Sequence, residues 1–173
     1  GLAVHRGIEP VQIEGSAGTG VGGFAWREAS GATGRVDCDA VALGFHLRPE
    51  SQLADLARCE FHFAPPWQQW LPRLDVDGRS SVARLYLAGD GARVLGAEAA
   101  QCSGELAALA ALRDLGLPVS ETAMARLRDR LAGHARFAAG LATAFPWPGA
   151  LAAGVADATI VCRCEAITAG ELR

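Results

Sequence analysis

The residues best suited to bind a cofactor lie near the middle of the chain, where residues 85–91 read Leu-Tyr-Leu-Ala-Gly-Asp-Gly. The apolar run predicts a buried strand, the glycines predict a tight turn, and the Ala-rich residues that follow predict a helix. The free N–H groups at a helix start attract anions such as a pyrophosphate. The carboxylate of Asp90 can accept hydrogen bonds from sugar-like hydroxyl groups, and Gly89 and Gly91 let the backbone come close to a ligand. The alternative is an ordinary strand–turn–helix with an aspartate in its turn.

A second candidate site lies at residues 162–165, which read Cys-Arg-Cys-Glu. A C-x-C pair in an extended or tightly turned segment favours a soft metal or an iron–sulfur cluster, because [2Fe–2S] clusters take four cysteines. Thr168 is expected to cap a helix after the pair. A thiol-redox or metal module built on Cys162 and Cys164 is the alternative.

A glycine-rich segment at residues 18–23 reads Gly-Thr-Gly-Val-Gly-Gly and matches the G-x-G-x-x-G pattern of dinucleotide-binding turns. That interpretation requires a helix after the glycines. The next residues, Phe24 to Glu28, look like a strand instead. We therefore expect a flexible hairpin loop here.

The composition indicates a globular chain and excludes several function classes. Of 173 residues, 50% are hydrophobic, the net charge is −3, and all 16 basic residues are arginines, so lysine-dependent chemistry is excluded. The arginines are scattered, which argues against nucleic-acid binding. Five cysteines without a signal peptide favour a cytoplasmic location. Residues 137–156 carry no charge, but Pro146 and Pro148 predict two helical pieces rather than a membrane span.

The remaining elements follow from periodicity and turn residues. Strands are expected at residues 2–5, 11–14, 22–28 and 35–44, with Glu9-Pro10 as a break. Helices are expected at 51–58, 97–115 and 121–145, capped by Ser51, Gly116 and Ser120. The aromatic segment 61–70 is interpreted either as a cover over a ligand or partner patch, or as local packing of a long loop, and residues 72–82 read as a turn.

Four segments together resemble one family of flavoenzymes. Residues 85–100 are similar to the second flavin-binding motif of FAD-dependent pyridine nucleotide-disulfide-type oxidoreductases. Residues 39–49 resemble the strand that returns from their NAD(P)-type domain, and residues 75–82 resemble the approach to the flavin strand. With Cys-Arg-Cys-Glu, the chain most resembles the alpha subunits of opine (octopine/nopaline) oxidase, hydrogen cyanide synthase and amino-acid dehydrogenase complexes.

The resemblance implies an α/β fold, α+β within this piece: part of a two-domain FAD/NAD(P)-binding protein. Residues 1–48 would end the NAD(P)-type domain, 49–118 would belong to the FAD domain, 119–156 would form a helical extension, and 157–173 would begin a [2Fe–2S] domain. Both ends of the chain read as cuts, so we expect a fragment of a longer protein. Because the other flavin-binding turn is missing from it, we expect weak or no FAD binding by the fragment alone.

The resemblance also implies the function and the site. An amino acid or an opine-like amine would be oxidised, with electrons passing through flavin and a [2Fe–2S] centre to other subunits of a hetero-oligomer. The FAD-binding residues would be Gly89, Asp90, Gly91, Gly96, Ala97 and Glu98, and Cys162 and Cys164 would form half of the cluster site. His46 is either a ligand or base, or more simply structural. The sequence predicts no catalytic base and leaves the substrate open among opines, proline derivatives and glycine. The alternative is a non-catalytic module for partner binding or homo-oligomerisation.

Overall fold

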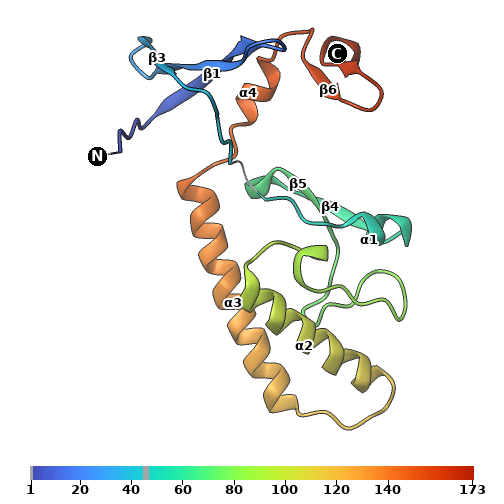
Figure 1. Ribbon diagram of the computed structural model, residues 1–173. Helices are drawn as coiled ribbons and strands as arrows, with labels where there is room; N and C mark the ends of the chain where they lie inside the picture. Colours follow the sequence, from blue (N-terminus) through green and yellow to red (C-terminus); the bar gives the residue numbers. More distant parts are fainter. Residues whose placement is uncertain (1, 45–46) are drawn as a thin grey trace. The chain divides into compact units, whose positions relative to one another are not determined.

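The computed structural model describes residues 2–44 and 47–173 (Figure 1). By their contacts these residues form two compact units, Gly1–Phe45 and His46–Arg173. Each unit is described by itself below. His46, a candidate ligand or base in the sequence, lies outside the described residues.

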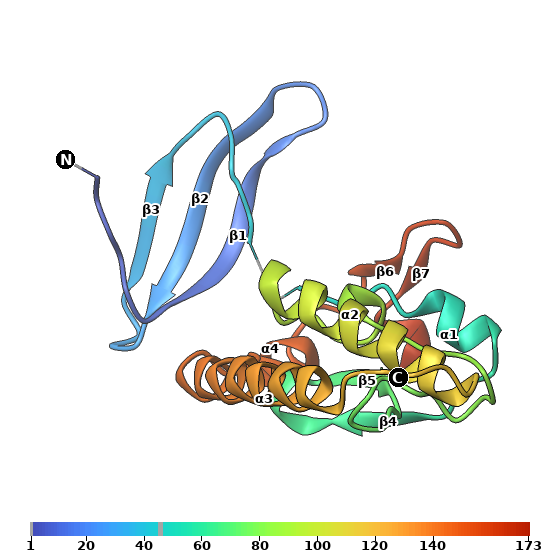
Figure 2. The same ribbon diagram turned by 90° about the horizontal axis from the view of Figure 1, so that it is seen from below.

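The first unit is an antiparallel meander of three strands, in the order β1-β2-β3 (Figure 2). The strands are β1 (Ile8–Ser16), β2 (Gly20–Glu28) and β3 (Thr33–Asp37). Trp26 of β2 is buried, and its ring lies directly over Gly34 of β3, where an added Cβ would come within 2.2 Å of the ring. The glycine-rich segment 18–23 forms the β1–β2 turn and the start of β2. The predicted hairpin loop is therefore confirmed.

The strand limits in this unit differ from the predictions. β1 runs through Glu9-Pro10, because a bulge between Pro10 and Gln12 accommodates the missing N–H of the proline. Residues 2–5 and 41–44 are not strands, so those predictions were wrong. Asp37 pairs with Gly23, close to the first residue of β2, and residues 41–44 therefore lie beyond the end of the partner strand.

The core of the second unit is an antiparallel pair of helices, α2 (Ala97–Asp114) and α3 (Glu121–Ala144), as predicted from their periodicity (Figure 1). Three side chains of α2 and two of α3 form the buried centre of the pair: Cys102, Leu106, Ala110, Met124 and Leu127. The connection between the helices is fixed by the predicted caps. Gly116 has a φ of +77° and follows α2, and the Ser120 hydroxyl accepts a hydrogen bond of 3.2 Å from the N–H of Ala123.

Only the first half of the apolar stripe on α3 is buried. Met124 and Leu127 are covered by α2, whereas Phe137 and Phe145 are 69% and 65% exposed. The reason is the length of α2: its first turn already lies beside His134, whose Nε2 is 3.9 Å from the Glu98 carboxylate. Beyond that point α3 has no part of α2 to pack against.

The predicted aromatic segment forms a β-hairpin rather than an irregular loop. β4 (Phe61–Ala64) pairs with β5 (Gln69–Pro72), and a 3₁₀ turn, η1 (Pro65–Trp67), connects them. Phe63 and Trp70 face each other across the strands with ring centroids 5.6 Å apart, and both are exposed. Before the hairpin, α1 (Gln52–Leu56) is shorter than predicted, and Ser51 precedes it without a side-chain capping bond.

The predicted strand at residues 85–88 did not form. These residues are extended and half-buried, but they make a single bridge, between Arg79 and Tyr86. The Leu87 N–H donates to the Gly78 carbonyl at 2.9 Å, and the Ser80 N–H donates to the Leu85 carbonyl at 3.0 Å. A strand needs a continuous neighbour, and the short turn that ends at Ser80 offers only this one place for pairing.

The last part of the chain consists of short elements: α4 (Gly149–Ala153), β6 (Ile160–Cys162), β7 (Ile167–Thr168) and the 3₁₀ turn η3 (Gly170–Leu172). The break between α3 and α4 confirms two helical pieces, and none of the described helices combines the length and apolar character needed to cross a bilayer. Thr168 donates from its N–H and hydroxyl to the Glu171 carboxylate, at 2.8 and 2.9 Å. This is the carboxylate half of a capping box, although only a 3₁₀ turn follows.

Candidate functional site

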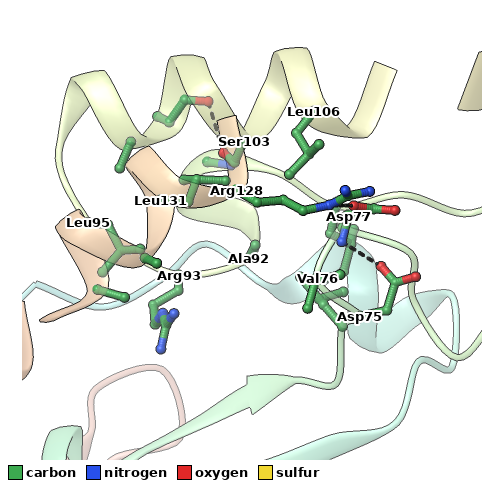
Figure 3. A pocket seen from close by; sticks show the side chains of 18 of the residues that line it. Asp75, Val76, Asp77, Ala92, Arg93, Leu95, Ser103, Leu106, Arg128 and Leu131 are labelled. Atoms are coloured by element: carbon green, nitrogen blue, oxygen red, sulfur yellow. Dashed lines mark hydrogen bonds and ion pairs between the residues drawn. The ribbon is translucent and has the colours of Figure 1, made fainter. Parts of the chain in front are cut away.

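A cleft of about 620 Å³ opens between the first half of α2, the middle of α3, the turn at residues 75–78 and the β4–β5 hairpin (Figure 3). Its size is within the range of small-molecule sites. Leucine and alanine side chains make up most of its wall, from Leu71 of β5 to Leu131 of α3. The polar groups of the wall include Arg93, Ser103 and Arg128.

Gly89 lies in the wall of this cleft, at the turn predicted to contact a cofactor. It opens the 3₁₀ turn η2 (Gly89–Gly91) with a φ of +57°, and an added Cβ would meet the Cβ of Ala100 at 3.4 Å. Its N–H donates to the Ser103 hydroxyl at 2.9 Å, and that hydroxyl donates to the Ala100 carbonyl at the same distance. The turn is therefore attached to α2 by a side chain that the sequence alone did not single out for this role.

The other predicted cofactor residues surround the same turn. Asp90 is exposed, and its carbonyl accepts from the Glu50 N–H at 2.9 Å. In the described part of the chain the Asp90 carboxylate forms no ion pair, so it remains available to a ligand. Gly91 ends the turn. Gly96 is the N-cap of α2 with a φ of +95°, and Ala97 and Glu98 form the first turn of that helix.

The start of α2 keeps free hydrogen-bond donors. Gly96 has no side chain to cap the helix, and its carbonyl accepts from the N–H of Ala100. Within the described residues, the N–H groups of Ala97, Glu98 and Ala99 find no protein acceptor. Such groups carry the positive end of the helix dipole.

Arg93 lies on the loop between η2 and α2 and lines the cleft (Figure 3). Its guanidinium carbon is 5.3 Å from the centre of the Trp67 ring, which is a cation–π distance. Burial lowers the pKa of Arg93. No carboxylate in the described residues pairs with it.

The far end of the cleft is held by a buried carboxylate, that of Asp77, which is 3% exposed. Arg128 and Arg113 donate to it at 2.6 Å each, and Arg79 donates at 3.0 Å. The bond from Arg128, with smaller contributions from the other arginines, lowers the pKa of Asp77 to about 2 against the opposing effect of burial. The pairing joins the turn at residues 75–78 to α2 and α3.

The same arginine connects to the end of α2. Arg79 donates to both oxygens of Asp114, at 2.6 and 2.8 Å, and the Tyr86 hydroxyl donates to that carboxylate at 2.6 Å. The bonds from Arg79 and Tyr86 lower the pKa of Asp114 to about 2. The bond to Asp114 raises the pKa of Tyr86. These charges are paired with one another and form a structural clamp at the cleft.

Cys162 and Cys164 are brought together as the sequence predicted for a ligand pair. Their sulfur atoms are 3.1 Å apart, Cys162 at the end of β6 and Cys164 in the turn that follows. The hydrogen bond from Cys164 lowers the pKa of Cys162. Among the described residues no group of three or more His, Cys, Asp or Glu side chains is placed to hold a metal ion. The pair therefore offers two thiolates only.

The cleft residues differ in how far the sequence indicated them. The turn at Gly89 was found from its glycines, because they are local signals. Arg93 was missed although it lies between the two predicted glycine positions, because only the fold shows that it faces a cleft. Arg113 and Arg128 were missed because their partner, Asp77, lies more than 30 residues away in the chain.

Comparisons with known proteins agree on one group of enzymes. No protein-family model matches the chain. An opine oxidase subunit from Agrobacterium tumefaciens (strain Ach5) is 41% identical, over 80% of this chain and 28% of the relative. The corresponding opine oxidase subunit of Rhizobium meliloti is 36% identical over 98% of this chain and 32% of the relative. The hydrogen cyanide synthase subunit HcnB of Pseudomonas protegens is 28% identical over 99% of this chain and 38% of the relative.

These relatives support an opine oxidase or amino-acid oxidoreductase family. The chain spans about a third of the length of the opine oxidase and HcnB subunits that it matches. The similarity to the opine oxidase subunit of Rhizobium meliloti extends over almost the whole chain and therefore includes both the cleft and the cysteine pair.

Proposed function

We propose that this chain is part of an FAD-dependent oxidoreductase subunit that oxidises an amino acid or an opine-like amine. The observation that carries the proposal is the cleft beside η2 and the start of α2, in a chain similar to opine oxidase subunits. The predicted cofactor residues surround that cleft, and a carboxylate without an ion pair, free N–H groups and Arg93 supply polar contacts of both kinds.

The residues present fit a flavin nucleotide. Asp90 would accept hydrogen bonds from the hydroxyl groups of the ribityl chain. The N–H groups of Ala97 and Glu98 would donate to a negatively polarised edge or to phosphate. Gly89, which leaves room next to Ala100, would let the ligand approach the backbone. When bound, FAD supplies two-electron redox chemistry, and the chain orients it and shields it from water.

We further propose that Cys162 and Cys164 are two of the four cysteine ligands of a [2Fe–2S] centre that carries electrons onward. The short distance between their sulfur atoms and the lowered pKa of Cys162 support a ligand pair, since iron binds thiolates. The remaining ligands would come from other residues. Iron analysis after anaerobic reconstitution tests this: iron should fall strongly in Cys162→Ser and remain in Cys59→Ser, and equal iron in both would refute the proposal.

Flavin binding is tested by FAD fluorescence during titration with the chain and with Asp90→Ala. We expect weak binding in the original chain, and loss of binding in Asp90→Ala, because the carboxylate acceptor is removed. Asp129→Ala is the matched control, since Asp129 is an exposed aspartate on α3. Equal binding by Asp90→Ala and Asp129→Ala would refute the assignment of Asp90.

A second candidate is a non-catalytic module for partner binding or self-association. Exposed aromatic side chains favour it, on the β4–β5 hairpin (Phe63, Trp70) and on the last turns of α3 (Phe137, Phe145). The relatives are named as subunits, so other oxidoreductase subunits are the proposed partners. Sedimentation equilibrium distinguishes the candidates: association at micromolar concentration without any FAD binding favours the module. The cytoplasmic location stays a prediction.

A further inference from the structure

We propose that Arg93 forms an oxyanion subsite in the cleft, which binds the carboxylate or phosphoryl group of an amphipathic ligand. The inference depends on the cleft and on Arg93, and it does not require that the ligand be FAD. It goes beyond the proposed function because neither the resemblance nor the relatives assign a role to this arginine.

The first argument is charge. Three other charged groups of the cleft wall are already paired: Arg128 with Asp77, and Asp75 with Arg79. Arg93 is the arginine of the wall for which the described residues supply no carboxylate and no hydrogen-bond acceptor. Burial lowers its pKa, so an anion that returned its lost hydration would be bound favourably.

The second argument is orientation. The ring of Trp67 lies 5.3 Å from the guanidinium carbon and covers it on one side. A guanidinium held against an aromatic ring loses less conformational freedom when its planar donors meet an anion. In Figure 3 the Arg93 side chain extends away from Arg128 and from the Asp77 pairing, so its donors are separate from the clamp.

The third argument is the rest of the wall. A second polar atom of the lining, Nδ1 of His62, is buried and has no hydrogen-bond partner. Most other groups that line the cleft are apolar, among them Leu71, Leu74, Leu87 and Leu95. A fully hydrated ion would leave these leucines against water. A ligand with one anionic group and an apolar body satisfies both parts of the wall.

The test uses three probes with the same six-carbon tail: hexanoate, hexyl phosphate and hexanol. Binding is followed by NMR at the indole N–H of Trp67, which is assigned by its loss in Trp67→Phe. We expect both anions to shift this signal, and hexanol to bind at least about tenfold more weakly, because charge-assisted hydrogen bonds are lost. The tighter of the two anions identifies whether a carboxylate or a phosphoryl group is the preferred source.

Three variants assign the effect. Arg93→Gln should weaken both anions about tenfold and leave hexanol unchanged, and Arg93→Lys should retain part of the binding because it keeps the charge without the planar donors. Arg126→Gln, an exposed arginine of α3, should behave as the original chain. Backbone spectra of each variant report whether the fold is kept. Equal anion binding by Arg93→Gln, equal binding of hexanol and the anions, or no shift of Trp67 would overturn the proposal. If FAD fails to bind but the anions bind through Arg93, only the flavin assignment is lost.

Discussion

Replacing Asp77 by asparagine should destabilise the second unit by about 3 kcal/mol, the range for removing one partner from a buried ion pair. Asp77 is 3% exposed, and Arg79, Arg113 and Arg128 donate to its carboxylate. The pKa of about 2, against an ordinary value of about 3.9, corresponds to about 2.5 kcal/mol of stabilisation at neutral pH. Asparagine keeps the shape of the side chain, but it leaves three arginines facing a neutral amide.

The sign of the pH dependence follows from the same shift. Because the pKa of Asp77 is lower in the folded state, its contribution is complete at pH values above about 4 and is lost as the pH falls toward 2. About half of the linked contribution should be gone at about pH 3. The difference between the original chain and Asp77→Asn should therefore shrink in acid.

Urea unfolding followed by helical circular dichroism measures both effects, because the signal comes mainly from α2 and α3. Asp129→Asn is the matched control: Asp129 is an exposed aspartate of the same helix as Arg128, and its replacement should change the free energy of unfolding by less than about 0.5 kcal/mol. An Asp77→Asn variant as stable as Asp129→Asn at pH 7, or a difference that stays constant from pH 7 to pH 3, would refute the reasoning.

Three further changes test the packing around the site, each by urea unfolding. Gly78→Ala should destabilise by about 1–3 kcal/mol, because φ is +87° and the added Cβ would lie 2.9 Å from the Leu87 carbonyl oxygen, whereas Gly104→Ala, in open space on α2, should stabilise by up to about 1 kcal/mol; equal effects would contradict this. Leu106→Ala should cost about 2–5 kcal/mol because Leu106 is 1% exposed, and a loss no larger than for the 74% exposed Leu115→Ala would be inconsistent with a core on α2. Ser120→Ala should cost about 1 kcal/mol through loss of the bond from Ala123, and an unchanged midpoint would show that this cap is not needed.

Local signals predicted the helices well. The limits of α2 and α3 follow from apolar periodicity, from Gly116 and from the Ser120 cap, all of which act within a few residues. The hairpin of β4 and β5 was missed because an aromatic run with Pro65-Pro66 reads equally as a loop, and only pairing between its halves distinguishes the two. The expected strand at Leu85–Leu87 failed for the same reason, since a strand depends on a neighbour that the sequence does not name.

The site divides along the same line. The glycines of η2 and the C-x-C spacing of Cys162 and Cys164 are short motifs, and the structure brings each set together. The free guanidinium of Arg93 and the buried carboxylate of Asp77 are products of tertiary structure: one is defined by the absence of a nearby acid among the described residues, the other by arginines distant in sequence. Sixteen arginines without any lysine gave no indication of which were paired.

The most direct test of a flavin site beside α2 is an NMR titration of the ¹⁵N-labelled chain with FAD, which detects weak binding at individual residues. The account predicts that the amide signals of residues 89–91 and 96–98 shift together and saturate, and that Asp90→Ala loses these shifts while Asp129→Ala retains them. Shifts confined to other parts of the chain, or unchanged shifts in Asp90→Ala, would contradict it.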